Sequence, residues 1–134
     1  IKNQNEIAKM RESNRIVAQL LHDIKEMIQP GVSTKELDDF AEALIRREGG
    51  YPAFKGYTIP GLKPFPGAIC ASINGCIVHG IPSVQRKLKD GDIIGIDVGV
   101  LKDGFYGDGA ATYVVQSSTE KIDRLLRVTK EALH

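Results

Sequence analysis

Two aspartates interrupt otherwise apolar segments late in the chain. Asp97 lies in GDIIGIDVGV and Asp108 follows in FYGDGAATYVV. The pattern predicts two antiparallel strands, in which side chains alternate between the two faces. A turn centred between Lys102 and Asp103 would place the acids directly opposite each other, whereas a type I′ turn at Asp103 and Gly104 would make them diagonal neighbours. Either register puts both carboxylates on one face.

Two like charges at that spacing repel each other and destabilise a sheet unless something compensates them. A shared proton, a basic partner or a metal cation would each do so. The plain alternative is a solvent-facing pair of acids at the edge of the sheet. Glycines around the acids are poor strand formers that allow close approach to the backbone; they are Gly95, Gly99, Gly107 and Gly109.

A histidine in the stretch VHGIPS is the next candidate for chemistry. His79 is one of only three histidines and lies shortly before Pro82. Its imidazole could assist a reaction or simply cap a carbonyl in a turn. Cys70 and Cys76 lie close by in the sequence and could pair. No secretory signal opens the sequence, so we expect reduced thiols in the cytosol.

The composition is ordinary for a soluble globular domain. The 134 residues carry a formal net charge of +1. Nothing in this charge balance calls for nucleic acid or an anionic membrane as a partner. The basic residues Arg86, Lys87 and Lys89 are therefore interpreted as a solvated loop. No apolar run approaches the roughly 20 residues that a membrane-spanning helix needs.

Helical periodicity and caps predict the elements that must position these residues. A first amphipathic helix is predicted over about 4–28, opened by a capping box of Asn3 and Glu6. A second box, Ser33 and Glu36, opens another helix, which a pair of glycines ends. His22 and both methionines are not among the candidate site residues, because they fit the helical stripes or their edges.

Strands are predicted in the second half of the chain. The stretch 51–70 is rich in proline, glycine and aromatic residues and is expected to be a long loop. A first hairpin is predicted around Asn74 and Gly75, and a second hairpin carries the two aspartates. A third helix begins near Ser118 and is still in progress at the last residue, so we expect the chain to be cut there. This order of elements predicts an α+β fold.

Several linked motifs resemble one family of enzymes. FPGAICASINGCIVHGIPS followed by LKDGDIIGIDVGVLKDGFYGDGAATYVV is similar to type I methionine aminopeptidases, and so are EIAKMRESNRIVAQLL, PGVSTKELD and GGYPAFKGY. The resemblance covers essentially the whole chain. It implies half of a pita-bread fold, with antiparallel strands and two to three helices. Residues 1–134 would form the N-terminal half of the catalytic domain, and the C-terminal half is absent from this chain.

The resemblance also implies a dinuclear metal site. Asp97 and Asp108 match two of the five metal ligands of the family, and a histidine and two glutamates would come from the second half. The ions would be two divalent cations, for which Co, Mn, Fe and Zn are candidates. His79 matches the histidine that contacts the substrate near the scissile amide and stabilises the transition state.

A substrate pocket is implied by the same resemblance. Phe54, Tyr57, Phe65 and Cys70 match positions that line the pocket for the first side chain of the substrate. An apolar pocket with a soft sulfur suits the thioether of methionine. The plain alternative is that these side chains belong to the core packing. The stretch 58–64 departs from the family as an apparent insertion. Gly75 is another departure, because the family commonly has an acid at that position.

The implied activity is removal of N-terminal methionine from nascent polypeptides, in the cytoplasm and close to the ribosome. The chain alone is expected to have weak or no activity, because two carboxylates cannot hold two metals firmly. Three alternatives stay open. One is a non-catalytic pita-bread module that binds peptides, another is a proline-specific aminopeptidase of the same fold, and a third is a half-domain that pairs with itself or with a C-terminal half.

Overall fold

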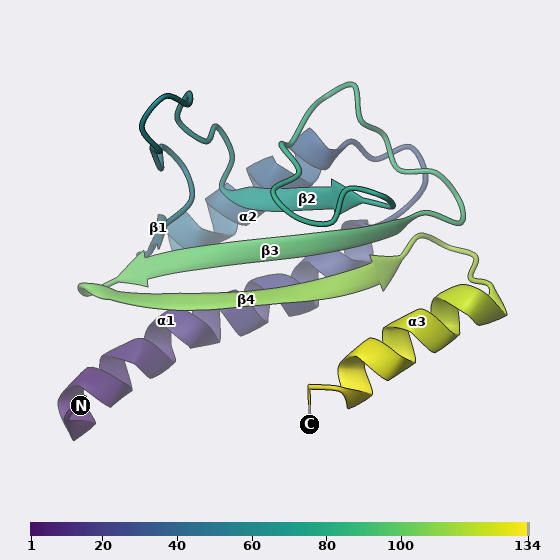
Figure 1. The fold of residues 1–134 in the computed structure, drawn as a ribbon. Coiled ribbons are helices and arrows are strands. Elements are labelled where there is room, and N and C mark those ends of the chain that lie inside the picture. Colours follow the sequence, from purple (N-terminus) through teal and green to yellow (C-terminus); the bar gives the residue numbers. More distant parts are fainter. Residues whose placement is uncertain (134) are drawn as a thin grey trace.

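The computed structural model describes residues 1–133, which form three α-helices, one short 3₁₀ helix and four strands (Figure 1). In chain order the elements are α1 (Gln4–Asp23), η1 (Ile24–Met27), α2 (Thr34–Arg47), β1 (Tyr51–Pro52), β2 (Ile69–Ile73), β3 (Ile93–Lys102), β4 (Phe105–Val114) and α3 (Glu120–Glu131). Helices and antiparallel strands occupy separate layers of one fold, so the predicted α+β class is confirmed.

Both predicted capping boxes are present. The Asn3 side chain accepts a hydrogen bond from the Glu6 amide at 3.0 Å, and the Glu6 carboxylate accepts one from the Asn3 amide at 2.8 Å. Ser33 and Glu36 form the equivalent box at α2. The first helix ends earlier than predicted, because its last turn tightens into η1 and Ile28 has left helical geometry with a ψ of 84°. A proline follows shortly afterwards and disfavours further helix.

The sheet is built around β3. Strands β1 and β2 pair with one edge of β3, and β4 pairs with the other edge along the full length of the hairpin, all antiparallel. Between β3 and β4, Asp103 and Gly104 have φ angles of 51° and 81°. Two successive left-handed residues are what a type I′ turn requires. The predicted second hairpin is therefore confirmed.

The predicted first hairpin, around Asn74 and Gly75, is wrong. Asn74 has the expected left-handed φ of 51°, but the next residues of the described chain form no strand. The Asn74 side chain instead donates to Asp92 at 2.8 Å and accepts from the Ile93 amide at 3.0 Å, which ties the end of β2 to the start of β3. The segment beyond the turn is exposed, and Ile77 has 89% of its surface accessible.

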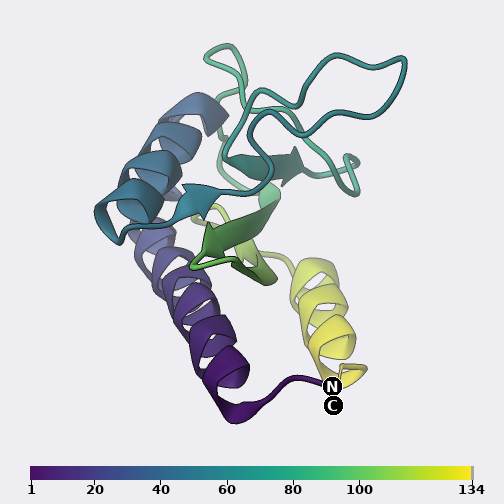
Figure 2. The same cartoon turned by 90° about the vertical axis from the view of Figure 1, so that its left-hand side faces the viewer.

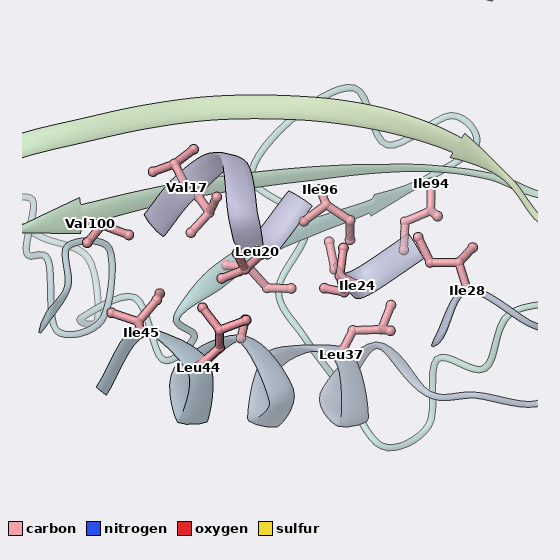
Figure 3. Packing of buried hydrophobic residues seen from close by; sticks show 14 of the residues in the cluster. Val17, Leu20, Ile24, Ile28, Leu37, Leu44, Ile45, Ile94, Ile96 and Val100 are labelled. Atoms are coloured by element: carbon pink, nitrogen blue, oxygen red, sulfur yellow. The ribbon is translucent and has the colours of Figure 1, made fainter. Parts of the chain in front are cut away.

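Alternate side chains of β3 form the core together with α1 and α2 (Figure 3). The fully buried members on β3 are Ile94, Ile96, Val98 and Val100, and they pack against helix residues that include Leu20, Ile24, Leu37 and Ile45. Each such side chain contributes roughly 1.5–3 kcal/mol relative to exposure. This core fixes the sheet on one face and leaves the odd-numbered side chains of β3 on the opposite face.

Helix α3 stands apart from this core. It lies on the side of the sheet away from α1 and α2 (Figure 2). The predicted third helix is present, but it ends at Glu131 instead of continuing to the last residue. Thr119 caps its start by accepting a hydrogen bond from the Ile122 amide at 3.3 Å. None of the helix's residues is buried, and Leu125 is 54% exposed. Within the described residues α3 therefore has little tertiary packing, and an isolated helix of 12 residues is only marginally stable in water.

Candidate active site

The two aspartates lie on the same face of the β3–β4 hairpin. Asp97 is opposite Ala110, and Asp108 is opposite Gly99. The acids are therefore diagonal neighbours, as the register with a turn at Asp103 and Gly104 predicts. Because the even-numbered side chains of β3 enter the core, Asp97 points to the face opposite α1 and α2. The expectation that both carboxylates share one face is confirmed.

Two negative charges without a salt-bridge partner are the main electrostatic feature of this face. Burial raises the pKa of Asp97, the charge of Asp108 raises it further, and nearby His79 opposes the shift. Within residues 1–133 no basic side chain forms a salt bridge with Asp97 or Asp108. A hard or borderline divalent cation suits such a pair of carboxylates.

The chain's own donors stop short of a complete metal site. Across residues 1–133, no group of three or more His, Cys, Asp and Glu side chains is placed to hold a metal ion. Asp97 and Asp108 fit a cation as two carboxylate ligands on one face.

The glycines near the acids accommodate close neighbours on both faces. A Cβ on Gly107 would lie 2.6 Å from the Asn14 amide nitrogen of α1. On the other face, a Cβ on Gly99 would lie 2.7 Å from a ring carbon of Phe54. Two groups therefore approach the backbone closely, as expected. Helix α1 lies against Gly107 on one face, and the Phe54 ring lies against Gly99, the cross-strand partner of Asp108, on the other.

His79 occupies a strained corner of the chain. Its φ is 59°, in the left-handed region that few residues other than glycine adopt. The next residue holds this corner, because the Gly80 amide donates to Ser72 Oγ at 3.1 Å and the Gly80 carbonyl accepts from the Ala71 amide at 2.8 Å. A side chain on Gly80 would overlap the Ala71 carbonyl group. Strain of this kind persists where the surrounding structure over-determines it, and it is common at functional sites.

A cavity of about 740 Å³ lies beside these groups. It is lined by every residue predicted for substrate binding, and Asp97 reaches it as well; the predicted lining residues are Phe54, Tyr57, Phe65, Cys70 and His79. Asp108 is the one predicted site residue outside this lining. The cavity also has aliphatic walls that the sequence reasoning missed, and these are Ile59, Leu62 and Ile81. The signal in the sequence for Ile59 and Leu62 was a Pro-Gly pair flanked by two aliphatic residues.

Cys70 lies at the base of the cavity, directly opposite Asp97 on β3. Burial raises the pKa of the Cys70 thiol to about 11, and the charge of Asp97 contributes to the shift. The thiol is therefore neutral at physiological pH and presents a soft, apolar surface. Both Cys70 and Cys76 are free, in agreement with the expected reduced thiols.

A buried carboxylate that the sequence reasoning missed anchors the entry to β2. Asp38 on α2 is 1% exposed, and its Oδ1 accepts from the amides of Ala68 at 2.7 Å and Ile69 at 3.2 Å. Lys35 also contacts Asp38, at 3.2 Å. The available signal was an acid beside Leu37 on the inward face of a predicted helix. Asp38 fixes the end of the loop from which the cavity lining is built.

The described helices include none that is both long enough and apolar enough to span a membrane. This agrees with the apolar runs of the sequence, which are all short. The basic residues 86–89 lie in an exposed segment between β2 and β3, apart from the buried Leu88. They form a solvated loop, as expected.

Known proteins resemble the chain along its full length. It is 47% identical over 133 residues to methionine aminopeptidase 1 of Bacillus subtilis and 46% identical over 134 residues to a methionine aminopeptidase of Borreliella burgdorferi. These matches cover 99% and 100% of the chain and 51% of each relative. The chain thus spans about half the length of the curated relatives it matches. The resemblance seen in the sequence motifs is confirmed.

Solved structures give the same result for the fold. The methionine aminopeptidase of Rickettsia prowazekii superposes with a TM-score of 0.91 at 38% identity, over 98% of this chain and 51% of that one. The prolidase of Pyrococcus furiosus, at 23% identity and a TM-score of 0.78, shares the fold. These neighbours confirm the expected half of a pita-bread fold. The model of metallopeptidase family M24 matches residues 8–134, and the chain therefore belongs to metallopeptidase family M24.

Proposed function

We propose that this chain supplies the N-terminal half of a methionine aminopeptidase, which removes the first methionine from new polypeptides by metal-dependent hydrolysis. The observation that carries the proposal is the convergence of Asp97, His79 and Cys70 on one cavity with aromatic walls. The relatives at 40–47% identity named methionine aminopeptidase support the same assignment. The substrate class is a peptide with a free amino terminus and an apolar first residue.

Asp97 and Asp108 would hold the metal, and we propose two divalent ions chosen among Co, Mn, Fe and Zn. Their proximity on one face, without a salt-bridge partner in the described chain, supports this role. A bound metal of this kind polarises the peptide carbonyl and activates the attacking water. The remaining ligands would come from a C-terminal half that pairs with residues 1–134.

His79 is proposed to donate a hydrogen bond to the scissile amide of the substrate. Its imidazole borders the cavity next to Asp97, and the bonds of Gly80 to β2 hold its corner in place. A preorganised donor at the reacting group stabilises developing charge without reorganisation during the reaction. Its removal should therefore reduce kcat more than it raises KM.

The pocket formed by Phe54, Tyr57, Phe65 and Cys70 is proposed to bind the methionine side chain. Because the pKa of the Cys70 thiol is about 11, the base of the pocket carries no thiolate at neutral pH. An uncharged sulfur and aromatic rings suit an unbranched thioether, and a charged first residue would lose hydration there without compensation. Both free thiols fit the proposed cytoplasmic location, close to the ribosome.

The test is a substrate panel. The chain is assayed with Mn²⁺ or Co²⁺, alone and mixed with the segment of the Bacillus subtilis relative that lies beyond the match. We expect methionine release from Met-Ala-Ser in the mixture, weak or no release by the chain alone, and no cleavage of Xaa-Pro peptides. Cleavage confined to Xaa-Pro peptides would replace the proposal with a proline-specific activity. If peptides bind without metal and no peptide is hydrolysed when metal is added, the proposal would be replaced by that of a non-catalytic peptide-binding module.

A further inference from the structure

The loop between β1 and β2 contains a small hairpin, here called the pocket hairpin, which comprises residues 56–65. It stands out from the sheet (Figure 2). Its base is closed by two backbone hydrogen bonds, from the Gly56 amide to the Phe65 carbonyl at 2.8 Å and from the Phe65 amide to the Tyr57 carbonyl at 2.9 Å. The segment is thus a defined structure rather than an irregular loop. Both Tyr57 and Phe65, at its base, line the cavity.

The tip of the pocket hairpin is a locally encoded turn. The Leu62 amide donates to the Ile59 carbonyl at 3.0 Å, which closes a four-residue turn. Pro60 and Gly61 occupy its central positions, and Gly61 has a φ of 85°. This is the residue order of a type II turn, in which proline presets the first central residue and glycine supplies the left-handed second one. The turn therefore fixes the backbone positions of Ile59 and Leu62 relative to each other.

Two exposed aliphatic side chains flank this turn at the mouth of the cavity. Ile59 is 51% exposed and Leu62 is 66% exposed, and both line the same cavity as His79 and Asp97. The segment that carries them, 58–64, is also the stretch that departs from the family resemblance. Clustered apolar side chains left in water next to a cavity are typical of ligand-binding surfaces.

We infer that Ile59 and Leu62 are specificity-determining residues, which form the outer wall of the pocket for the first side chain and let it bind unbranched apolar residues longer than methionine. The inference rests on the proposed function. It is argued from the fact that one hairpin lines the cavity from base to tip. The base supplies the aromatic side chains of the inner wall, and the tip extends that wall outward. Each additional buried methylene contributes about 0.8 kcal/mol, which is roughly a fourfold gain in affinity.

The experiment compares the wild-type chain with the double variant Ile59→Ala/Leu62→Ala, which keeps Pro60 and Gly61. Val84→Ala is the matched control, since Val84 is a 65% exposed aliphatic residue outside the cavity lining. Substrates X-Ala-Ser carry methionine, norleucine, 2-aminoheptanoate or 2-aminooctanoate as X. Values of kcat/KM are measured with the second-half segment of the Bacillus subtilis relative and Mn²⁺.

In the wild type, two additional buried methylenes should raise kcat/KM for 2-aminooctanoyl-Ala-Ser roughly sixteenfold relative to Met-Ala-Ser. In the double variant this ratio of kcat/KM values should be about tenfold lower. Val84→Ala should leave this ratio unchanged. An unchanged ratio in the double variant would overturn the inference. So would a loss confined to a second-residue series, such as Met-Val-Ser against Met-Ala-Ser, because the tip would then face the second side chain.

A binding measurement separates this inference from the proposed function. The metal-free ¹⁵N-labelled 134-residue chain is titrated with methioninol, norleucinol and their two longer homologues, and NMR shifts give each Kd. Affinity should rise with chain length in the wild type and should rise much less in the double variant. If the mixture of wild-type chain and second-half segment hydrolyses no peptide, yet wild type and double variant differ in this binding, the proposed function fails and the inference about Ile59 and Leu62 stands. Equal chain-length dependence in both proteins would contradict the wall.

Discussion

Cys70 and Asp97 are direct cross-strand partners, so a buried thiol and a carboxylate share the base of the cavity. Burial, reinforced by the charge of Asp97, raises the pKa of the thiol from 9.0 to about 11. The folded protein therefore keeps the thiol proton at pH values where the unfolded chain has lost it. The thiol at the base of the pocket is therefore uncharged at physiological pH. The same pKa shift makes the free energy of unfolding fall at alkaline pH.

The first prediction concerns this pH dependence. Between pH 9 and 11 the folded state binds more protons at Cys70 than the unfolded state does, so the free energy of unfolding falls as pH rises. The contribution is fully present below about pH 9 and amounts to on the order of 2–3 kcal/mol. The free energy of unfolding is measured in urea at pH 8 and pH 11 for the wild type and for Cys70→Ala. Between these pH values it should fall by about that amount more in the wild type than in Cys70→Ala. Parallel losses in both proteins would contradict the prediction.

The corner at His79 leads to the second prediction. Gly80→Ala should lower the free energy of unfolding by about 3 kcal/mol, because the new methyl group overlaps the Ala71 carbonyl group in a tightly packed site. Gly75→Ala is the matched control, since a Cβ there meets nothing within 4 Å. Urea midpoints compare the two variants. Similar midpoints would mean that Gly80 does not hold the corner as described.

Local signals explain why much of the fold could be predicted. The two capping boxes and the turn at Asp103 and Gly104 involve residues only three or four positions apart, so the residue types alone predict them. The period-two alternation around Asp97 likewise placed both acids on one face. The register followed once the turn was fixed.

Long-range hydrogen bonds explain what could not be predicted. Asn74 and Gly75 carry a strong hairpin signal, yet the Asn74 side chain bonds to Asp92 and Ile93, about 20 residues away, and β2 pairs with β3 instead. Asp38 is similar, because its partners Ala68 and Ile69 are 30 and 31 residues distant. Nothing near either residue in the sequence reveals these partners.

The third prediction tests the anchor formed by Asp38. Asp38→Ala leaves two buried backbone amides without an acceptor and should lower the free energy of unfolding by about 2–4 kcal/mol. Asp39→Ala is the control on the next position of α2, because its side chain is 64% exposed and its one salt bridge among the described residues is to Lys35. This variant should change stability by less than about 1 kcal/mol.

Hydrogen exchange localises the effect of the anchor. In Asp38→Ala the amides of Ala68 and Ile69 should exchange faster than in wild type, whereas amides in the centre of β3 should keep most of their protection. Uniform acceleration across β3 and β2 would instead mean that Asp38 contributes to global stability alone. Unchanged exchange at Ala68 and Ile69 would show that their hydrogen bonds to Asp38 are not formed in solution.

The fourth prediction is the most direct test of the proposed function, and it uses the two carboxylates themselves. Asp97→Asn and Asp108→Asn should each lower kcat/KM for methionine release from Met-Ala-Ser by at least about 100-fold, measured with Mn²⁺ and the second-half segment of the Bacillus subtilis relative. Asp103→Asn, an equal charge change in the turn of the same hairpin, should leave the rate within about twofold, because Asn also suits the left-handed turn position. Equal rates in all three variants would contradict the assignment of this site.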